Sequence, residues 1–337
     1  MTLQPGTRVG GVVVDALLGV GGTAAVYRCH VERTGRALAL KVLDRDHSRH
    51  EPSARPRFRR EVEALRTLDH PAIVSLHDAD TEGPEPWMLV DLVDGRTLDE
   101  YRRDRAGHIP LHESALLLWP VADALDHAHA AGLVHRDIKP HNILVPRHPY
   151  GGPSAVLTDF GIAVRDGDGS LTETGYSIGT ARYMAPEQLG GDEVGPPADQ
   201  YALALVLGEL VTGSVSVHGA AGLFGRATAG PELEVLRGPL TRALDMDPAR
   251  RFPSCTAFLE AVTAAAAHRS TAPLPRPVAT RREPSHPPRP PRPPQPVPAR
   301  RSVEQTRDRG DTTVVIWVTT LLLLCVLAAV AIAVGLT

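Results

Sequence analysis

The order of apolar and polar residues along the first quarter of the chain is typical of a small sheet with one helix. Residues 9–18 are rich in β-branched side chains and residues 36–43 alternate between apolar and polar, which predicts two strands. Short apolar runs at 73–77 and 87–92 predict two more. Residues 57–68 have helical periodicity. With a further strand after the glycine-rich turn described below, we expect five strands and one helix.

The pattern becomes mainly helical after residue 95. Helical periodicity recurs in five segments: 98–105, 111–131, 199–211, 233–244 and 257–267. Two short apolar runs predict strands at 143–145 and 155–157. Residues 199–211 are strongly apolar, so we expect them in the core of a second, larger lobe. The sequence therefore predicts an α+β fold with an N-terminal lobe at about 9–92 and a C-terminal lobe at about 95–266.

The last part of the chain has a composition that cannot form a packed core. Residues 267–311 are rich in proline and arginine, with twelve prolines between 271 and 300, which predicts a disordered, semi-rigid spacer. A ligand for a proline-binding module is the alternative. The uncharged apolar run at 312–336 is long enough to span a bilayer as one helix. An apolar tail that docks on a partner is the alternative there.

Charge and cysteine usage narrow the function classes. The nine Arg and four acidic residues after residue 270 leave 27 basic and 35 acidic residues before it, a net charge of −8. An acidic globular part argues against nucleic acid as a partner. Cys29, Cys255 and Cys325 show no metal-ligand spacing, so we expect reduced thiols in a cytosolic environment.

One stretch, from His135 to Asn142, carries the strongest chemical signal. It lies between a predicted helix and a predicted strand, so Asp137, Lys139 and Asn142 should share one rigid loop. A carboxylate to orient a hydroxyl, an ammonium to neutralise phosphate and an amide oxygen to hold a metal ion together suit phosphoryl transfer. The chain has only two lysines, Lys41 and Lys139, and a single asparagine. Because Arg supplies positive charge everywhere else, their positions in candidate catalytic motifs argue against chance.

Two features of the N-terminal lobe fit the same chemistry. The glycines of residues 19–27 form a turn whose backbone could close over phosphates, although a plain glycine hairpin has the same pattern. Lys41 lies in an apolar strand and needs a carboxylate or a phosphate nearby. Glu61 and Glu63 on the predicted helix are the candidate partners. The alternative is that both carboxylates only solvate the helix.

Two later segments add a metal-ligand candidate and a candidate regulatory loop. Asp159 follows a short strand and begins the sequence Asp-Phe-Gly, so its carboxylate could face the same metal ion as Asn142. A type I turn is the alternative interpretation. Residues 166–178 are polar, contain glycines and carry several hydroxyl side chains. We expect a mobile loop there.

These motifs, in this order, resemble those of the eukaryotic-like (Hanks-type) protein serine/threonine kinases over roughly residues 9–266, most closely the bacterial membrane-anchored group. The resemblance implies a bilobal protein-kinase fold. It also implies ATP as the phosphate donor, Mg²⁺ or alternatively Mn²⁺ as the metal ion, and Ser or Thr of protein substrates as the acceptor. A kinase homodimer would serve trans-autophosphorylation.

The resemblance also assigns catalytic and binding roles. Asp137 would accept the proton of the substrate hydroxyl, and Lys139 would neutralise the γ-phosphate. Lys41 would hold the α- and β-phosphates and pair with Glu61, which fits the family spacing better than Glu63 does. The metal ion would be held by Asn142 and Asp159. The nucleotide would be held by Leu18, Gly19, Val20, Gly21, Gly22, Thr23, Ala24, Ala25, Val26, Ala39, Lys41, Val90, Asp91 and Val93.

Three further roles concern control and structure. Thr172 and Thr174 would be the regulatory phosphosites, and Arg136 would contact the phosphate to order the loop. Glu187 and Arg251 would form a buried structural ion pair. With the apolar run as a C-terminal anchor, we expect a single-pass protein of the cell membrane, surrounded by lipid at that helix, with its kinase domain cytoplasmic and no extracellular domain.

The sequence departs from the family pattern in two places, and these keep other functions open. Ala24 replaces the third glycine of the loop, which adds a methyl group near the phosphates. The stretch after Thr212 is short for a substrate-docking region. Both departures favour a pseudokinase scaffold that recruits partners, although the intact catalytic residues argue against it. A small-molecule phosphotransferase is a third candidate, against which the Ala185-Pro186-Glu187 sequence and the threonine-rich loop argue.

Overall fold

The computed structural model describes residues 3–44, 53–147, 155–160, 180–214, 224 and 231–270. They belong to a unit that extends from Met1 to Pro275, and Arg276–Thr337 forms a second unit. The predicted phosphosites Thr172 and Thr174 lie outside the described residues, as do the linker beyond residue 270 and the apolar run at 312–336. None of the helices that the structure describes is long and apolar enough to cross a membrane.

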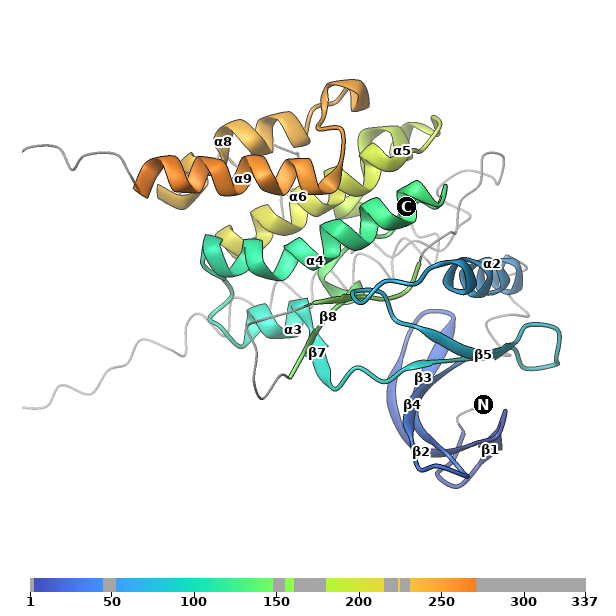
Figure 1. Ribbon diagram of the computed structural model, residues 1–337. Helices are drawn as coiled ribbons and strands as arrows, with labels where there is room; N and C mark the ends of the chain where they lie inside the picture. Colours follow the sequence, from blue (N-terminus) through green and yellow to red (C-terminus); the bar gives the residue numbers. More distant parts are fainter. Residues whose placement is uncertain are drawn as a thin grey trace, which may run out of the picture. The chain divides into compact units, whose positions relative to one another are not determined.

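The N-terminal lobe is an antiparallel sheet with helix α2 packed against it (Figure 1). The strands are β1 Arg8–Val9, β2 Val12–Val20, β3 Ala24–Val31, β4 Ala37–Leu43, β5 Leu76–Asp80 and β6 Trp87–Asp91, in the order β1-β2-β3-β4-β6-β5. The sheet thus has six strands instead of the predicted five, because the two-residue β1 pairs with the start of β2. Helix α2 covers Ala54–Thr67 and buries Phe58, Val62 and Leu65 on one side.

The predicted strand at 73–77 was placed too early. Strand β5 begins at Leu76, and Ile73 makes only an isolated bridge to Leu157. Ile73 and Val74 are buried because they belong to the main core, so their apolar character reflects packing and not strand pairing. At the other end of the domain, helix α9 continues to Ser270, beyond the predicted boundary at 266.

The C-terminal lobe is mainly helical. Its helices are α3 Leu98–Arg103, α4 Leu111–Ala130, α5 Pro186–Gly190, α6 Pro196–Thr212, α8 Pro231–Ala243 and α9 Cys255–Ser270. Its small sheet has the order β7-β8-β9, with β7 Gly95–Thr97, β8 Ile143–Pro146 and β9 Val156–Leu157. Short 3₁₀ helices occupy Pro140–Asn142, Thr180–Tyr183 and Pro248–Arg250. The two-lobed arrangement agrees with the expectation from the sequence.

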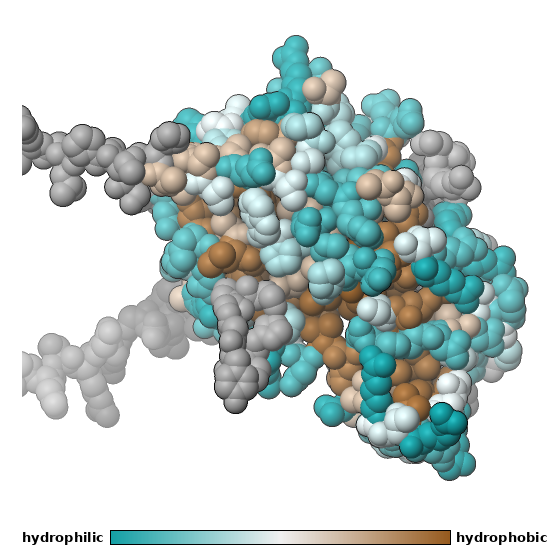
Figure 2. Space-filling view, in the orientation of Figure 1, coloured by the Kyte–Doolittle hydropathy of each residue, from teal (hydrophilic) through white to brown (hydrophobic). Residues whose placement is uncertain are grey.

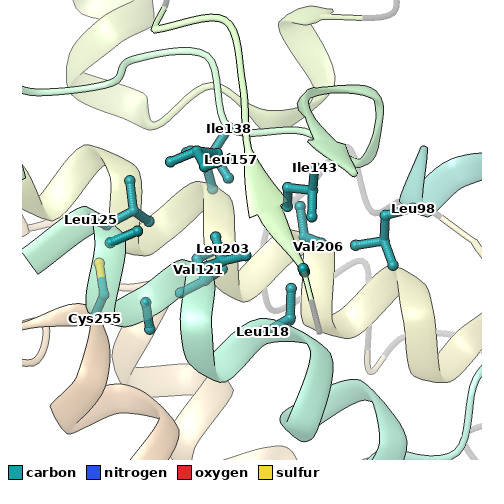
Figure 3. Packing of buried hydrophobic residues seen from close by; sticks show 14 of the residues in the cluster. Leu98, Leu118, Val121, Leu125, Ile138, Ile143, Leu157, Leu203, Val206 and Cys255 are labelled. Carbon is teal, nitrogen blue, oxygen red and sulfur yellow. The ribbon is translucent and has the colours of Figure 1, made fainter. Parts of the chain in front are cut away.

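The core of this lobe holds the candidate catalytic stretch in place. Helix α6 is buried on every side between Ala198 and Leu210, as its strongly apolar sequence predicted. Ile138, which lies between Asp137 and Lys139, and Ile143, which follows Asn142, are buried in the same cluster as Leu203 of α6 (Figure 3). Full burial of such side chains contributes about 1.5–3 kcal/mol each. Hydrophobic packing of Ile138 and Ile143 therefore holds the catalytic loop in place.

Candidate active site

A carboxylate lies at the centre of the catalytic loop. Oδ2 of Asp137 accepts hydrogen bonds from Nζ of Lys139 at 2.8 Å and from Nδ2 of Asn142 at 3.0 Å. The same Asn142 amide donates to the Asp137 backbone carbonyl at 2.8 Å. The side chains of Lys139 and Asp137 are 20% and 21% exposed and Asn142 is buried, so the predicted trio forms one partly buried hydrogen-bonded group.

A fully buried carboxylate on α6 holds the backbone of this loop. Asp199 accepts the backbone amides of His135 at 2.8 Å and of Arg136 at 2.7 Å. Arg136 has a φ of 66°, a left-handed conformation that costs free energy for a residue with a side chain. The bonds to Asp199 offset that cost, and Gln188 adds a bond to the Arg136 carbonyl at 3.0 Å. The sequence contained a signal for this role: a lone acid opening an apolar helix.

His135 joins the catalytic loop to the Asp-Phe-Gly segment. Its ring lies 4.7 Å from the ring of Phe160, which is almost completely buried. Nε2 donates to the carbonyl of Thr158 at 3.1 Å, and Nδ1 accepts the amide of Asp137 at 3.3 Å. Burial lowers the pKa of His135 in spite of the nearby charges of Asp199 and Asp137, so the ring is neutral at pH 7.

The two lobes meet at Lys41. Its Nζ donates to both carboxylate oxygens of Glu61, at 2.7 and 3.0 Å, and to Oδ1 of Asp159 at 2.5 Å. Glu63 is exposed on the opposite side of α2, so it is Glu61 that lies next to the lysine. The fold thus brings together Lys41 of β4, Glu61 of α2 and Asp159 of the Asp-Phe-Gly segment. Lys41 and Asp159 are 118 residues apart in the sequence.

The charges around Lys41 do not balance. Burial lowers the pKa of Lys41, but the charges of Asp159 and Glu61 outweigh burial and hold that pKa above its ordinary value. The charge of Lys41 lowers the pKa of Asp159. Burial, together with the charge of Asp159, raises the pKa of Glu61 to about 7 although Lys41 acts in the opposite direction. One ammonium therefore faces two carboxylates, which favours a further cation at this place.

The predicted metal ligands fit such a cation. Asn142 commits its amide nitrogen to Asp137, which leaves its carbonyl oxygen as the atom able to bind a metal ion. Asp159 has a φ of 55°, and this strained conformation places its carboxylate at Lys41 in the cleft. A carboxylate and an amide oxygen are the donors that Mg²⁺ prefers in nucleotide sites.

The cleft between the lobes has a volume of about 500 Å³, within the range of small-molecule sites. Figure 2 shows hydrophobic side chains in the hollow between the helical part and the sheet. Of the residues predicted to bind the nucleotide, eight line this cleft: Leu18, Gly19, Val26, Ala39, Lys41, Val90, Asp91 and Val93. The other six do not line it: Val20, Gly21, Gly22, Thr23, Ala24 and Ala25. They lie at the tip of the β2–β3 hairpin, where Gly21 donates to the Ala24 carbonyl at 2.8 Å.

Several apolar residues that line the cleft were not predicted from the sequence. Val74, Met88 and Leu144 contribute to its walls, and Thr158 and Glu100 add polar groups. Each of the apolar residues lies in or beside a strand, where its alternation with core residues resembles ordinary packing. No sequence signal separates a side chain that faces a cleft from one that faces the core.

Replacing Ala24 with glycine tests whether its methyl group hinders the phosphates. Ala24 is only 6% exposed and pairs with Leu43 of β4. Because its methyl group is covered by protein, we expect Ala24→Gly to change turnover by less than about twofold. Glycine at the first residue of β3 should lower the free energy of unfolding by at most about 1 kcal/mol. Steady-state kinetics and thermal unfolding check both values, and a tenfold gain in turnover would show that the methyl group does hinder the reaction.

The remaining predicted residues have structural partners. Nη1 and Nη2 of Arg251 donate to Oε1 and Oε2 of Glu187 at 2.7 and 2.8 Å, and both side chains are buried. Arg136 directs Nη2 to the carbonyl of Val194 at 3.2 Å. The loop residues that Arg136 was predicted to contact, Thr172 and Thr174, lie outside the described part of the chain.

Comparison with known proteins agrees with this geometry. Residues 12–229 match the family model described as protein kinase domain. The serine/threonine-protein kinases PknF and PknJ of Mycobacterium tuberculosis are 38% identical over 276 residues and 35% identical over 277 residues, each covering 78% of this chain. The alignments cover 58% of PknF and 46% of PknJ, so the chain spans about half the length of the curated relatives it matches.

Solved structures show the same similarity. The crystal structure of the Mycobacterium tuberculosis PknI kinase domain matches with a TM-score of 0.62 at 31% identity. The match covers 78% of this chain and 100% of that chain. The chain therefore belongs to the protein kinase domain family. Together with these relatives, the family match identifies its kinase domain as that of a bacterial Hanks-type serine/threonine-protein kinase.

Proposed function

We propose that this chain transfers the γ-phosphate of ATP to Ser and Thr hydroxyls of protein substrates. One observation carries the proposal: Asp137, Lys139 and Asn142 form one hydrogen-bonded group, and His141 beside them lines the cleft in which Lys41 is paired with Glu61. Phosphoryl transfer requires positioning and charge neutralisation more than covalent chemistry, and these groups supply both. The relatives named above are serine/threonine-protein kinases, which supports the same acceptor.

In the proposed reaction, the carboxylate of Asp137 orients the acceptor hydroxyl and takes its proton as the new oxygen–phosphorus bond forms. The bond between the γ-phosphorus and the bridging oxygen of ADP breaks. Lys139 neutralises charge on the transferred group, and Lys41 holds the remaining phosphates. When bound by Asn142 and Asp159, Mg²⁺ would supply additional neutralisation of phosphate charge.

Phosphoryl transfer by the full chain tests the proposal. Incubation with labelled Mg-ATP and a panel of acidic and basic proteins should place label on Ser or Thr and not on Tyr. A wild-type protein that binds ATP but labels nothing in the panel would favour the pseudokinase scaffold. Label on small hydroxyl compounds but not on proteins would favour a small-molecule phosphotransferase.

Regulation by loop phosphorylation is a further part of the proposal. Phosphate on Thr172 or Thr174, transferred in a kinase homodimer, would offer Arg136 a stronger partner than the Val194 carbonyl it now contacts. Arg136 is next to Asp137 on a backbone fixed by Asp199. A phosphate at Arg136 would therefore act directly on the catalytic loop.

We further propose that residues 312–336 tether the kinase domain to the inner face of the cell membrane. The support is the length and lack of charge of that run and the arginines before it. Deleting 312–337 should move the protein from the membrane fraction to the soluble fraction, as measured by centrifugation and immunoblotting. Deleting 276–301, a segment of the same length, should leave it in the membrane fraction. Continued membrane association of the first variant would contradict the tether.

A further inference from the structure

Two segments of the sheet contact the carboxylate of Asp91, a residue that lines the cleft. Oδ1 of Asp91, at the end of β6, accepts Nε2 of His77 at 2.7 Å and Nη2 of Arg36 at 3.2 Å. Arg36 precedes β4 and His77 lies in β5. The backbone amide of Asp91 donates to the Ser75 carbonyl at 3.1 Å. Asp91 is therefore fixed from both neighbouring strands at once.

The conformation of β5 is adapted to this contact. Leu76 pairs with Val90, but the next pair is Asp78 with Leu89, so His77 is the extra residue of a β-bulge. A bulge re-aims the side chain that it contains, and bulges are frequent beside active sites. A regular register would pair His77 with Leu89, whereas the bulge pairs Asp78 with Leu89 and leaves His77 without a partner in the ladder. The bulge thus removes His77 from the strand pairing, and the His77 imidazole contacts Asp91.

The cluster is electrostatically favourable. Burial raises the pKa of Asp91, but hydrogen bonds from His77 and Ser75 and the charges of His77 and Arg36 outweigh burial and lower that pKa below its ordinary value. The side chains of His77, Asp91 and Arg36 are 26%, 38% and 60% exposed. Their bonds are thus partly screened by solvent, and we expect a moderate effect on nucleotide binding from each.

The residues that follow Asp91 form the edge of the cleft. Asp91, Leu92, Val93 and Asp94 all line the cleft and connect β6 to β7 in the other lobe. Backbone contacts hold both ends of this connection: Asp91 pairs with Leu38 of β4, and the amide of Arg147 donates to the Asp94 carbonyl at 2.8 Å. The side-chain bonds of Asp91 to His77 and Arg36 add a further restraint at its first residue. The orientation of the amides and carbonyls nearest Asp91 therefore depends in part on the contacts of its side chain.

We propose that Arg36 and His77 are positioning residues, which hold Asp91 and so present the backbone of residues 91–94 to the adenine of ATP. Neither Arg36 nor His77 lines the cleft, and both act through the side chain of Asp91. The inference rests on the proposed function, because it presupposes ATP in the cleft. It adds a set of residues outside the cleft that would determine nucleotide affinity without taking part in the transfer.

Kinetics of His77 variants in the full chain test this inference. His77→Ala removes the donor to Asp91, so we expect the KM for ATP to rise roughly three- to tenfold while kcat stays within about twofold. His77→Gln keeps an amide donor without a ring, and it should bring KM back to within about twofold of the wild type. Titration with a fluorescent ATP analogue should show the same change in affinity. Arg36→Ala should raise KM by a smaller factor, because its bond is longer and more exposed.

The chain offers a matched control on the same sheet. His30 of β3 forms a similar exposed pair with Asp15 of β2, 2.7 Å apart, with no contact to residues 91–94. His30→Ala should leave the KM for ATP unchanged. An equal KM for His77→Ala and the wild type, an equal rise in His30→Ala, or a fall in kcat alone would overturn the inference. A wild type that binds no ATP would overturn the proposed function as well, which separates the two failures.

Discussion

Asp137→Asn is expected to lower the rate of phosphoryl transfer by roughly 10²- to 10⁴-fold and to leave the affinity for ATP nearly unchanged. Asparagine keeps the size of the side chain and can still accept a hydrogen bond from Lys139, but it cannot take the hydroxyl proton. The loop should keep its conformation, because Asp199 and not Asp137 holds its backbone. Transfer rates with saturating Mg-ATP, together with a binding titration, measure the two quantities.

Asp123→Asn is the control for this substitution. Asp123 is an exposed residue of α4 that contacts His70, so its replacement makes the same chemical change outside the cleft. The control should transfer phosphate at the wild-type rate. If Asp137→Asn retained more than about a tenth of the wild-type rate, Asp137 would not be the catalytic base.

Glu187→Ala is expected to cause the largest loss of stability, about 3–5 kcal/mol. The substitution leaves the Arg251 guanidinium buried without its carboxylate. The remaining contacts, to the carbonyls of Pro197 and Asp245 and to the ring of Tyr201, do not supply the missing negative charge. Denaturant unfolding measures the loss. In thermal unfolding it should lower Tm by on the order of 10 °C for a domain of this size.

Two further variants separate the buried charge from a simple loss of contacts. Glu32→Ala breaks the exposed pair with Arg8 and should cost less than about 1 kcal/mol. Replacing both Glu187 and Arg251 with methionine should recover much of the stability, because no unpaired charge remains in the interior. If the double variant were as unstable as Glu187→Ala, an effect other than the unpaired charge would be responsible.

Much of the site could be predicted from the sequence because the catalytic residues lie in short, rigid connections between regular elements. Asp137, Lys139 and Asn142 are close together in the chain, so their grouping needed no tertiary information. A lysine in an apolar strand requires a carboxylate, which made Glu61 and Glu63 of the same lobe the candidates, and the family spacing favoured Glu61. The structure places the side chains of Lys41 and Glu61 in direct contact.

The features that were missed depend on contacts between distant elements. Three features follow from how strands and helices pack, which periodicity does not encode. They are the bonds from the loop amides to Asp199, the bulge at His77 and the start of β5 at Leu76 instead of residue 73. Arg136 at positive φ is a case of the same kind, since no residue type in the stretch indicates it. Six residues at the hairpin tip do not line the cleft, and their contact with the nucleotide stays a prediction.

The most direct test of the account is site-resolved mass spectrometry of the full chain after incubation with Mg-ATP. An active serine/threonine kinase should acquire phosphate on Thr172 or Thr174, and Asp137→Asn treated in parallel should acquire none. A wild-type chain that binds ATP but remains as free of phosphate as Asp137→Asn, on itself and on every protein substrate offered, would contradict the account.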